Sequence, residues 1–455
     1  MKPFACHWLA LSSFLLSLLA HADIRPQYGG TLHLMMHAAP TTLDPADSRV
    51  PDSFARRSMI SLIFDTLVTM DEAGRPKPGL AESWQASKGN QHWQFRLRHG
   101  VKFHDGTPLT SDFVAASLRV ANPAWSVRAE GDSVVIDGDQ PNPEMLAEVA
   151  LARNAIAKRD GGERFNGTGP FHIVEWQPGK KLTLGAEEDC WRGRPFLDAV
   201  EIEMARNFRE QSNTLEAGRA DLIEVVPEQA HHFSPARGRL LSSAPVEFVA
   251  LVFGRDVALP DEKLLREALG LSVERGSIQS VLLQGAGQPA GSLLPTWISG
   301  FGFVFSSRAD LQKARQLRGQ AQTVRVSTIG YDSSDPLARL LVDRIVLNAK
   351  DAGLSLVPTA VGSTDLRLTR MPLASSDPWI ALQFVEVQTG LPQPQRKDSS
   401  IEELYAAEQT ALASQRIVPL FHLPVFYAAS TSLKNWSLRM DGTLDLTNAW
   451  LGAAK

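Results

Sequence analysis

The sequence has little of what several classes of protein require. It holds two cysteines, and Cys6 lies in an N-terminal segment that we expect to be removed, so only Cys190 remains and no intrachain disulfide can form. Charged residues make up 21% of the chain, with a formal net charge of -4, and no basic run indicates a nucleic-acid partner. Beyond the N-terminal segment, no stretch is long and apolar enough to span a membrane.

That N-terminal segment has the pattern of a secretory signal peptide. Lys2 supplies a positive charge, and Trp8 to Leu19 is an uncharged run too short for a permanent membrane helix. Ala20-His21-Ala22 then provides the small residues after which a signal peptidase cleaves, so residues 1–22 are predicted to be removed. Cys6 precedes the apolar run, which argues against a lipid anchor. We therefore expect a free protein exported to the periplasm.

Hydrophobic spacing alternates between the strand period and the helix period, which indicates an α/β fold. The length is typical of two or three domains. In the first half, alternating stretches predict mostly antiparallel strands, and residues 59–68 have helical spacing. The predicted strands cover residues 31–35, 92–98, 171–176, 181–187 and 199–205.

The second half, after residue 255, is richer in predicted helices. Asp261 is expected to cap one helix, Ser272 to begin another, and Gly285 to end that second helix in a left-handed conformation. A strand, a helix and a strand follow, and this order favours parallel pairing of the two strands. They cover residues 323–328, 335–353 and 354–358.

The run "KFHDGTPLTSDF", residues 102–113, resembles part of a catalytic site because His104 stands beside Asp105. Asp-Gly followed by Pro is, however, typical of a tight turn at the end of a strand. Thr110 or Ser111 can then cap the helix that begins next, since a hydroxyl accepts hydrogen bonds from the free N–H groups of a first turn. We interpret this run as a turn.

The run "NGTGPFHIVEW", residues 166–176, contains glycines that suggest a phosphate-binding loop. Such a loop lies between a strand and a helix, whereas Pro170 and a further strand follow these glycines. We interpret this run as the tight start of a strand.

Signatures of common hydrolases are absent, since the chain has no G-x-S-x-G, S-x-x-K or H-E-x-x-H. The histidine pairs His33/His37 and His231/His232 are the only candidates for metal binding that we identify. The second pair stands in a polar loop, and we expect no carboxylate or cysteine beside the first. We therefore predict no catalytic residue, no metal and no cofactor.

Several runs, taken in order, resemble a single family. They are "GGTLHLMMHAAPTTLDPADS", "LIFDTLVTMDEAGRPKPGLAESW", "WQFRLRHGVKFHDGTPLTSDFVAASL", "GTGPFHIVEWQPGKKLTL", "DCWRGRPFLDAVEI", "LEAGRADLIE", "LREALGLSVERGSIQSVLLQGAGQPAGSLLP" and "IVPLFHLPVFYAAS". In this order they are similar to the bacterial extracellular solute-binding proteins of family 5. This family comprises oligopeptide-, dipeptide- and nickel-binding components of ABC importers.

The resemblance implies a two-lobe α/β periplasmic binding protein (type II, cluster C-like) with mixed sheets and hinge crossings. The lobes of such a monomer close over a peptide or peptide-like solute, which a permease in the inner membrane then receives unaltered. Lobe I is expected at residues 23–252 plus 425–455, and lobe II at residues 253–424. The alternatives are a receptor of the same fold for a metal chelate, such as one of nickel, and, least favoured, a secreted hydrolase.

The resemblance also points to a ligand-binding segment. In peptide binders of the family an aspartate of the second lobe commonly holds the ligand's ammonium group, and "MPLASSDPWIALQF" stands in that place here. Asp377 is the candidate, with Ser375 and Trp379 beside it, although Asp-Pro is also a strong turn initiator. If the Asp-Pro pair sets the register, the equivalent position is Ala374 and the charge contact is lost.

Two further expectations concern the walls of the ligand site. The family's extra subdomain, at about residues 46–164, is compressed after Asn122, but a strand, a turn and a helix remain within "SVVIDGDQPNPEMLAEVA". Its shortening opens the cleft or limits the length of the ligand.

The hinge is expected at residues 247–255 and 417–427, where prolines restrict the second crossing to extended backbone. Side chains near these crossings, and one in the turn after the first strand, are candidate ligand contacts. For the two rings among them, simple packing is the competing interpretation. The candidates are Phe253, Arg255, His422 and Thr42.

Overall fold

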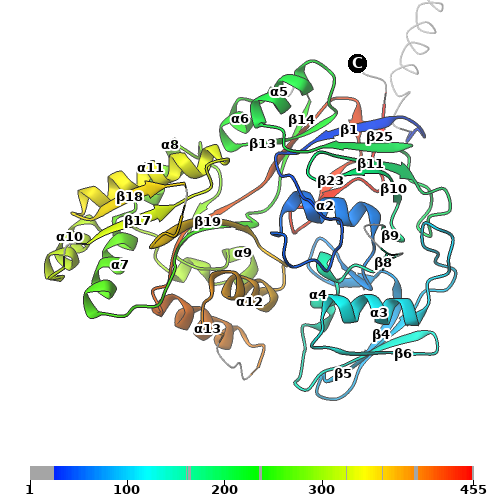
Figure 1. Ribbon diagram of the computed structural model, residues 1–455, viewed down its shortest axis with the longest axis horizontal. Helices are drawn as coiled ribbons and strands as arrows, with labels where there is room; N and C mark the ends of the chain where they lie inside the picture. The colour runs from blue at the N-terminus through cyan, green and yellow to red at the C-terminus, as the bar shows by residue number, and fades with distance from the viewer. Residues whose placement is uncertain are drawn as a thin grey trace, which may run out of the picture.

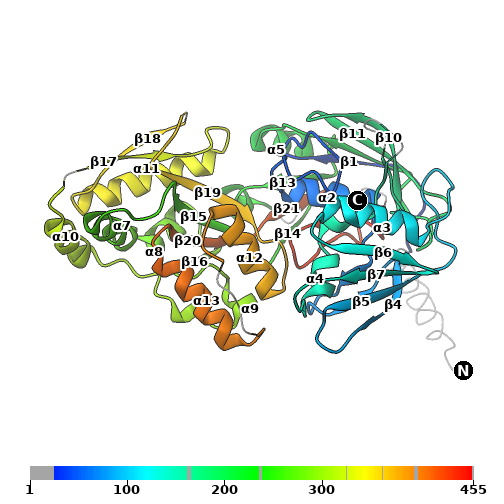
Figure 2. The same cartoon turned by 60° about the horizontal axis from the view of Figure 1, so that its bottom comes forward.

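The computed structural model describes residues 25–159, 161, 165–234, 238–323, 325–360, 362–393 and 398–452. The predicted signal peptide, residues 1–22, lies outside the described residues. Figure 1 shows two bodies side by side, and Figure 2 shows that they are also separate in the turned view. We call the body that contains the N-terminal strand the first body and the other the second body. The predicted α/β architecture is confirmed.

The first body is built on a seven-stranded mixed sheet. In spatial order its strands are β10 (Phe171–Gln177), β11 (Lys181–Ala186), β12 (Ala199–Glu203), β1 (Thr31–Met35), β13 (Leu222–Val225), β21 (Phe426–Ala429) and β14 (Arg239–Ser242). Strand β1 pairs in parallel with β12 and β13, and the other pairs are antiparallel. Helix α2 (Phe54–Ile63) packs on one face, and α5 (Phe208–Glu216) with α6 (Pro227–His232) packs on the other.

A four-stranded antiparallel sheet extends the first body. Its order is β4 (Ala81–Ala86), β5 (His92–Leu97), β7 (Ser133–Asp137) and β6 (Ser126–Glu130). It encloses its own core with helices α3 (Ser111–Ala121) and α4 (Met145–Val149), and the short helix η2 (Ala152–Asn154) packs beside α3. The strand, turn and helix predicted for the compressed subdomain are therefore confirmed as β7 and α4. Four two-stranded sheets complete the body: β2 (Val68–Met70) with β3 (Pro76–Pro78), β8 (Lys158–Arg159) with β9 (Phe165–Asn166), β22 (Leu433–Lys434) with β25 (Trp450–Leu451), and β23 (Ser437–Leu438) with β24 (Leu444–Asp445).

The second body is built on a six-stranded mixed sheet. Its order is β16 (Gln288–Pro289), β20 (Ile417–Leu423), β15 (Glu247–Phe253), β19 (Leu366–Pro372), β17 (Val326–Gly330) and β18 (Ser355–Thr359). Strands β17 and β18 pair in parallel, which confirms the arrangement predicted for the strand, helix and strand of this region.

Helices cover both faces of the six-stranded sheet. One core lies under α7 (Pro260–Ser272), α8 (Arg275–Val281) and α11 (Pro336–Asp351), and the other under α12 (Pro378–Thr389) and α13 (Ile401–Ala413). The elements α9 (Thr296–Ser299), η3 (Gly302–Val304) and α10 (Leu311–Gln320) complete the body.

The run that contains His104 and Asp105 is a turn, as predicted. Gly106 has a left-handed φ of +81°, and its N–H donates to Phe103 O at 2.8 Å. The Asp105 carboxylate accepts the N–H of Thr107 at 3.0 Å. These hydrogen bonds close a tight turn before α3.

The helix that follows this turn begins as predicted. Thr110 is its N-cap, and the Thr110 hydroxyl accepts the N–H of Phe113.

The glycines of "NGTGP" allow a close approach of two chain segments. A Cβ atom on Gly167 would lie 1.9 Å from Ile63 O, and one on Gly169 would lie 2.6 Å from the Ile63 carbonyl carbon. His104 joins them from the other side, because its Nδ1 accepts Gly167 N–H at 3.3 Å and its Nε2 lies 3.0 Å from Gly169 O. The run leads into β10, which confirms its interpretation as the start of a strand.

The helix predicted over residues 59–68 is displaced. Helix α2 begins earlier, at Phe54 after its N-cap Ser53, and ends at Ile63. The carbonyl of Ile63 accepts Gly169 N–H at 2.9 Å, so it cannot bond to the next helical turn, and Phe64 is extended. The predicted end was wrong because a residue more than a hundred positions away takes the hydrogen bond.

Three predicted helix boundaries of the second body were also wrong. Asp261 lies inside α7, whose N-cap is Leu259, and its carboxylate accepts the N–H groups of Gln322 and Thr323 at 2.9 and 3.0 Å. Ser272 is the last residue of α7 instead of the first of α8. Gly285 is left-handed, with φ +80°, but α8 has already ended at Val281.

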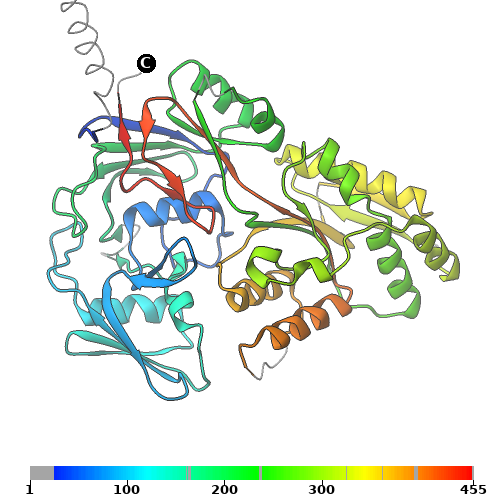
Figure 3. The same ribbon diagram turned by 180° about the vertical axis from the view of Figure 1, so that it is seen from behind.

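The chain passes between the two sheets at residues 243–246 and 424–425. The two passages pair with each other. Ser243 N donates to Val425 O at 3.0 Å, Val425 N donates to Ser243 Oγ at 3.0 Å, and Val246 N donates to Leu423 O at 3.0 Å. Figure 3 shows the green and the orange-red segments running together between the bodies.

The second passage lies where the sequence predicts a crossing. The first precedes the predicted residues 247–255, because residues 247–253 form strand β15 of the six-stranded sheet.

Candidate functional site

The two bodies meet where the chain leaves β19 and begins α12. Arg57 of α2 donates from Nη1 to the backbone carbonyl of Leu373 at 2.6 Å. Arg57 is buried and ion-paired with Asp52 at 2.5 Å. The hydroxyl of Ser399 donates to Glu144 at 2.6 Å. These contacts join segments far apart in the chain across the boundary between the bodies.

An apolar cluster lies at the same boundary. Its members come from β2, from α4 and the residues just after it, from the turn before α12 and from α12 itself: Met70, Ala147, Leu151, Ala374 and Ile380. Ala374, the alternative position for the family's aspartate, therefore packs against side chains of the first body. The segment leading into α12 therefore contacts the first body directly.

Within this segment the structure brings Ser375, Asp377 and Trp379 into one turn. Asp377 is the N-cap of α12, and its Oδ1 accepts the N–H groups of Trp379 and Ile380, each at 3.0 Å. Ser375 Oγ accepts the N–H of Asp377 at 3.0 Å. The indole of Trp379 is half-buried against the α12–α13 core. The Asp377 carboxylate thus holds the first turn of a helix.

Thr42 lies on the opposite side of the boundary, in the loop between β1 and α2. Its hydroxyl accepts the N–H of Asp44 at 3.1 Å. The Asp44 carboxylate pairs with Arg159 at 2.5 Å, and the Asp44 carbonyl accepts from Arg56 at 2.6 Å. The loop is therefore held in place by two arginines.

Phe253 and Arg255 are not brought to this boundary. Glu247, at the start of β15, pairs with Leu423 beside the passage. Phe253 stands at the other end of β15, and at about 3.3 Å per residue it is roughly 20 Å away from Glu247. The guanidinium of Arg266 lies 4.2 Å from the centre of the Phe253 ring. Arg255 forms an exposed ion pair with Glu262.

His422 lies in the core of the second body. It is buried, its ring stacks on Phe248 at 5.2 Å, and its Nε2 is 3.0 Å from Leu293 O. Burial lowers the pKa of His422 to about 4, so the ring is neutral near pH 7.

Sequence reasoning did not single out Glu224, which stands on β13 next to the passages. Its Oε2 accepts the N–H of His37 at 2.5 Å, and burial raises the pKa of Glu224 to about 7 despite that hydrogen bond. The ring of His37 stacks on Phe208 at 4.6 Å. An acid inside the apolar strand "LIEV" was the available signal.

The histidine pairs do not assemble a metal site. His33 Nδ1 lies 3.8 Å from Glu201, because β12 pairs with β1 and brings that acid alongside, while His37 contacts Glu224 instead. The expectation that no carboxylate accompanies this pair was therefore wrong. The part of the chain that the structure describes holds no group of three or more His, Cys, Asp or Glu suited to a metal ion.

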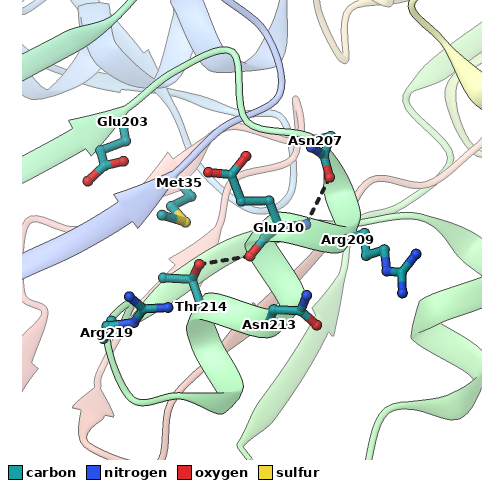
Figure 4. A pocket seen from close by; sticks show the side chains of 8 residues that line it. All are labelled: Met35, Glu203, Asn207, Arg209, Glu210, Asn213, Thr214 and Arg219. Carbon is teal, nitrogen blue, oxygen red and sulfur yellow. Dashed lines mark hydrogen bonds between the residues drawn. The ribbon is translucent and has the colours of Figure 1, made fainter.

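A pocket of about 630 Å³ opens on the flank of α5 (Figure 4). Its lining residues all belong to the first body: Met35, Glu203, Asn207, Arg209, Glu210, Asn213, Thr214 and Arg219. Asn207 caps α5 by accepting Glu210 N–H at 2.9 Å, and Thr214 donates to Glu210 O at 2.8 Å. Because no residue of the second body lines it, this pocket is not the interface between the bodies.

No helix in the described part of the chain combines the length and apolar character needed to cross a membrane. Comparison with known families gives the decisive observation. The profile of "Bacterial extracellular solute-binding proteins, family 5 Middle" matches residues 75–370, more than half of the chain. The chain belongs to this family. The proteins of the family are binding proteins and not enzymes, and they act in the periplasm or outside the cell.

Individual relatives agree with this membership. The chain is 27% identical to the oligopeptide-binding protein AppA of Bacillus subtilis over 298 residues, which are 58% of this chain and 54% of AppA. The chain spans about half the length of the curated relatives it matches, with 39%, 54% and 60% of their lengths covered.

Solved structures share the fold over nearly the whole chain. A dipeptide-binding protein of Pseudoalteromonas sp. SM9913, in complex with Met-Leu, superimposes with a TM-score of 0.79 at 17% identity, covering 93% of this family 5 chain and 100% of that chain. NikA of Staphylococcus aureus, in complex with Ni(L-His)2, gives a TM-score of 0.75 at 16% identity with the same coverage.

Proposed function

We propose that this chain is the solute-binding component of an ABC importer and holds a peptide or peptide-like solute between its two bodies. Membership of family 5 carries this proposal. The two paired passages support it physically, since two rigid sheets joined by short connecting segments can close and open without either core being disrupted. No bond of the solute is broken in this process.

In this proposal the two bodies are the lobes expected from the sequence, residues 23–252 plus 425–455 and residues 253–424. The membership of β15 in the six-stranded sheet supports moving the first boundary to residues 243–246. The solute is held between the loop that carries Thr42 and the turn from Ser375 to Trp379. For Phe253, Arg255 and His422 the observed contacts support packing within the second body.

We place the mature chain in the periplasm after removal of residues 1–22. There it acts as a monomer and delivers its solute to a permease in the inner membrane. The likeness of the chain to an oligopeptide-binding relative supports a peptide as the solute. A metal chelate is the second candidate, because the fold is shared with a structure that holds nickel and histidine.

Isothermal titration calorimetry separates these candidates. Mixed dipeptides and tripeptides are titrated into the purified mature protein, in parallel with a nickel-histidine chelate. Heat with peptides and none with the chelate is the expected result. Heat with the chelate alone would replace the peptide with the second candidate, and no heat with any peptide would overturn the peptide proposal.

A further inference from the structure

Glu224 lies near the end of β13, an inner strand of the seven-stranded sheet. It pairs in β13 with Tyr427 of β21, and the next pair, Val225 with Phe426, lies directly beside the second passage. Glu224 is half-buried, and its own N–H donates to Gln211 of α5 at 2.9 Å. The backbone and strand neighbours of this acid therefore hold it firmly next to the hinge.

The carboxylate of Glu224 lacks a cation. Its observed partner is the backbone N–H of His37, and none of the Lys, Arg or His side chains among the described residues forms an ion pair with it. Arg206, which is near enough for its carbonyl to contact His37, directs its guanidinium to Glu203 and Glu210. A desolvated carboxylate without a cation is unfavourable, which is why burial raises the pKa of Glu224 to about 7.

One acid of the second body lies near His37, whose backbone N–H donates to Glu224. Hydrogen bonds from Ser334 lower the pKa of Asp332, and the charges of Arg367 and His37 lower it further. His37 therefore lies within electrostatic range of the loop before α11. The titratable and charged residues beside Glu224 are His37, whose backbone N–H it accepts, Arg206, whose carbonyl contacts the His37 ring, and Tyr427, its partner on β21.

We propose that Glu224 forms the ionic contact with a cationic group, a primary ammonium, of the bound solute. This inference rests on the proposed function, because it assigns a residue to solute recognition. The geometry favours Glu224 over Asp377, whose Oδ1 already accepts two backbone N–H groups of α12. An ammonium group supplies the charge that the described residues around Glu224 do not.

The test compares trialanine with N-acetyl-trialanine by calorimetry, in the wild-type mature protein and in Glu224→Gln. The glutamine carbonyl can still accept the His37 N–H, so the fold is kept, which a thermal melt verifies. We expect the wild type to bind trialanine roughly 10- to 100-fold more tightly than its acetylated form. Glu224→Gln should remove that preference while leaving the affinity for N-acetyl-trialanine unchanged.

The pH dependence gives a readout that a purely structural role would not change. Binding of an ammonium group requires ionised Glu224, whose pKa of about 7 leaves it mostly protonated at about pH 5.5. The affinity for trialanine should therefore rise about 15-fold from about pH 5.5 to about pH 7, a range in which the peptide's own ammonium stays charged. Glu224→Gln should abolish this rise.

Glu408→Gln is the matched control. Burial also raises the pKa of Glu408 to about 7, but this acid lies in the core of the second body and accepts the backbone N–H of Leu294. Its substitution should leave the preference for trialanine and its pH dependence as in the wild type.

The outcomes separate this inference from the proposed function. Equal binding of trialanine and its acetylated form by the wild type overturns the role of Glu224 and leaves a peptide receptor. If no peptide binds, putrescine and arginine are titrated next. Binding of these amines that Glu224→Gln abolishes supports Glu224 while the peptide proposal fails, and an absence of binding overturns both.

Discussion

Three acidic side chains of this chain meet three different sets of partners. Asp65 accepts from Thr168 and Trp191, each at 2.9 Å, and Asp377 accepts backbone N–H groups at the start of a helix. Glu224 accepts one backbone N–H and has no described cation. At the scale of single residues, the partners that tertiary structure supplies therefore decide whether an acid is structural or available to a solute.

The role of Asp377 can be tested by two substitutions. Asp377→Ala removes the N-cap of α12 and should lower the free energy of unfolding by about 1 kcal/mol. Asp377→Asn keeps an oxygen that accepts the same N–H groups and should have nearly wild-type stability and trialanine affinity. Urea denaturation and calorimetry measure both quantities. Equal destabilisation by the two substitutions, or a large loss of affinity in Asp377→Asn, would contradict the assignment of a cap.

At the scale of secondary-structure elements, strands were predicted better than helix ends. The five strands predicted in the first half correspond to β1, β5, β10, β11 and β12. A strand with one buried face can be recognised from the alternation of apolar and polar residues, which is a local property of the sequence. Helix ends instead depend on which groups take the free carbonyls and N–H groups. Gly169 bonds to the last carbonyl of α2, and the cap of α7 is an apolar residue followed by Pro260.

The contact between α2 and the glycine run predicts a large effect of Gly167→Ala. A methyl group there would lie 1.9 Å from Ile63 O, so the two segments would have to separate, at a cost of more than about 2 kcal/mol in the free energy of unfolding. Gly276→Ala in α8 is the control, since a Cβ there meets nothing within 4 Å, and it should be neutral or slightly stabilising. Urea denaturation of both variants checks this, and a neutral Gly167→Ala would refute the steric argument.

At the scale of the whole molecule, the two bodies are joined in two ways. The paired passages at 243–246 and 424–425 are covalent, and the contacts of Arg57, Glu144 and the apolar cluster join the bodies a second time. The second set can separate without loss of either core. It therefore contributes to the balance between open and closed forms.

Substitution of Arg57 should shift that balance. Arg57→Met loses the hydrogen bond to Leu373 O. Because a hydrogen bond from a charged donor is worth about 1.5 to 3 kcal/mol, the population of the closed form should fall roughly tenfold or more. Small-angle X-ray scattering of the ligand-free protein should show a larger radius of gyration. The control is Arg49→Met, which removes an exposed ion pair with Asp47 and should change nothing. An unchanged radius in Arg57→Met would show that Leu373 O does not help to hold the bodies together.

Local patterns in the chain were sufficient for the α/β class, six strands of the first half (β1, β5, β7, β10, β11 and β12), the two turns around Gly106 and Gly167, and the parallel unit of β17, α11 and β18. Each depends on neighbouring residues, through side-chain alternation, turn chemistry or the spacing of one helix face. The order of motifs was also sufficient to indicate family 5.

Tertiary structure alone decided the ends of α2 and α7, the position of the first passage, and which polar side chains lie together. Phe253 and Thr42 had equal claims as candidates in the sequence, yet one packs at the far end of β15 in the second body and the other lies in the loop between β1 and α2 of the first body, where its hydroxyl accepts the N–H of Asp44. The candidacy of Glu224 as a solute contact depends on the position of β13 between β1 and β21, beside the hinge. The physical reason is that desolvation and hydrogen-bond partners come from segments distant in the chain, and no local pattern encodes them.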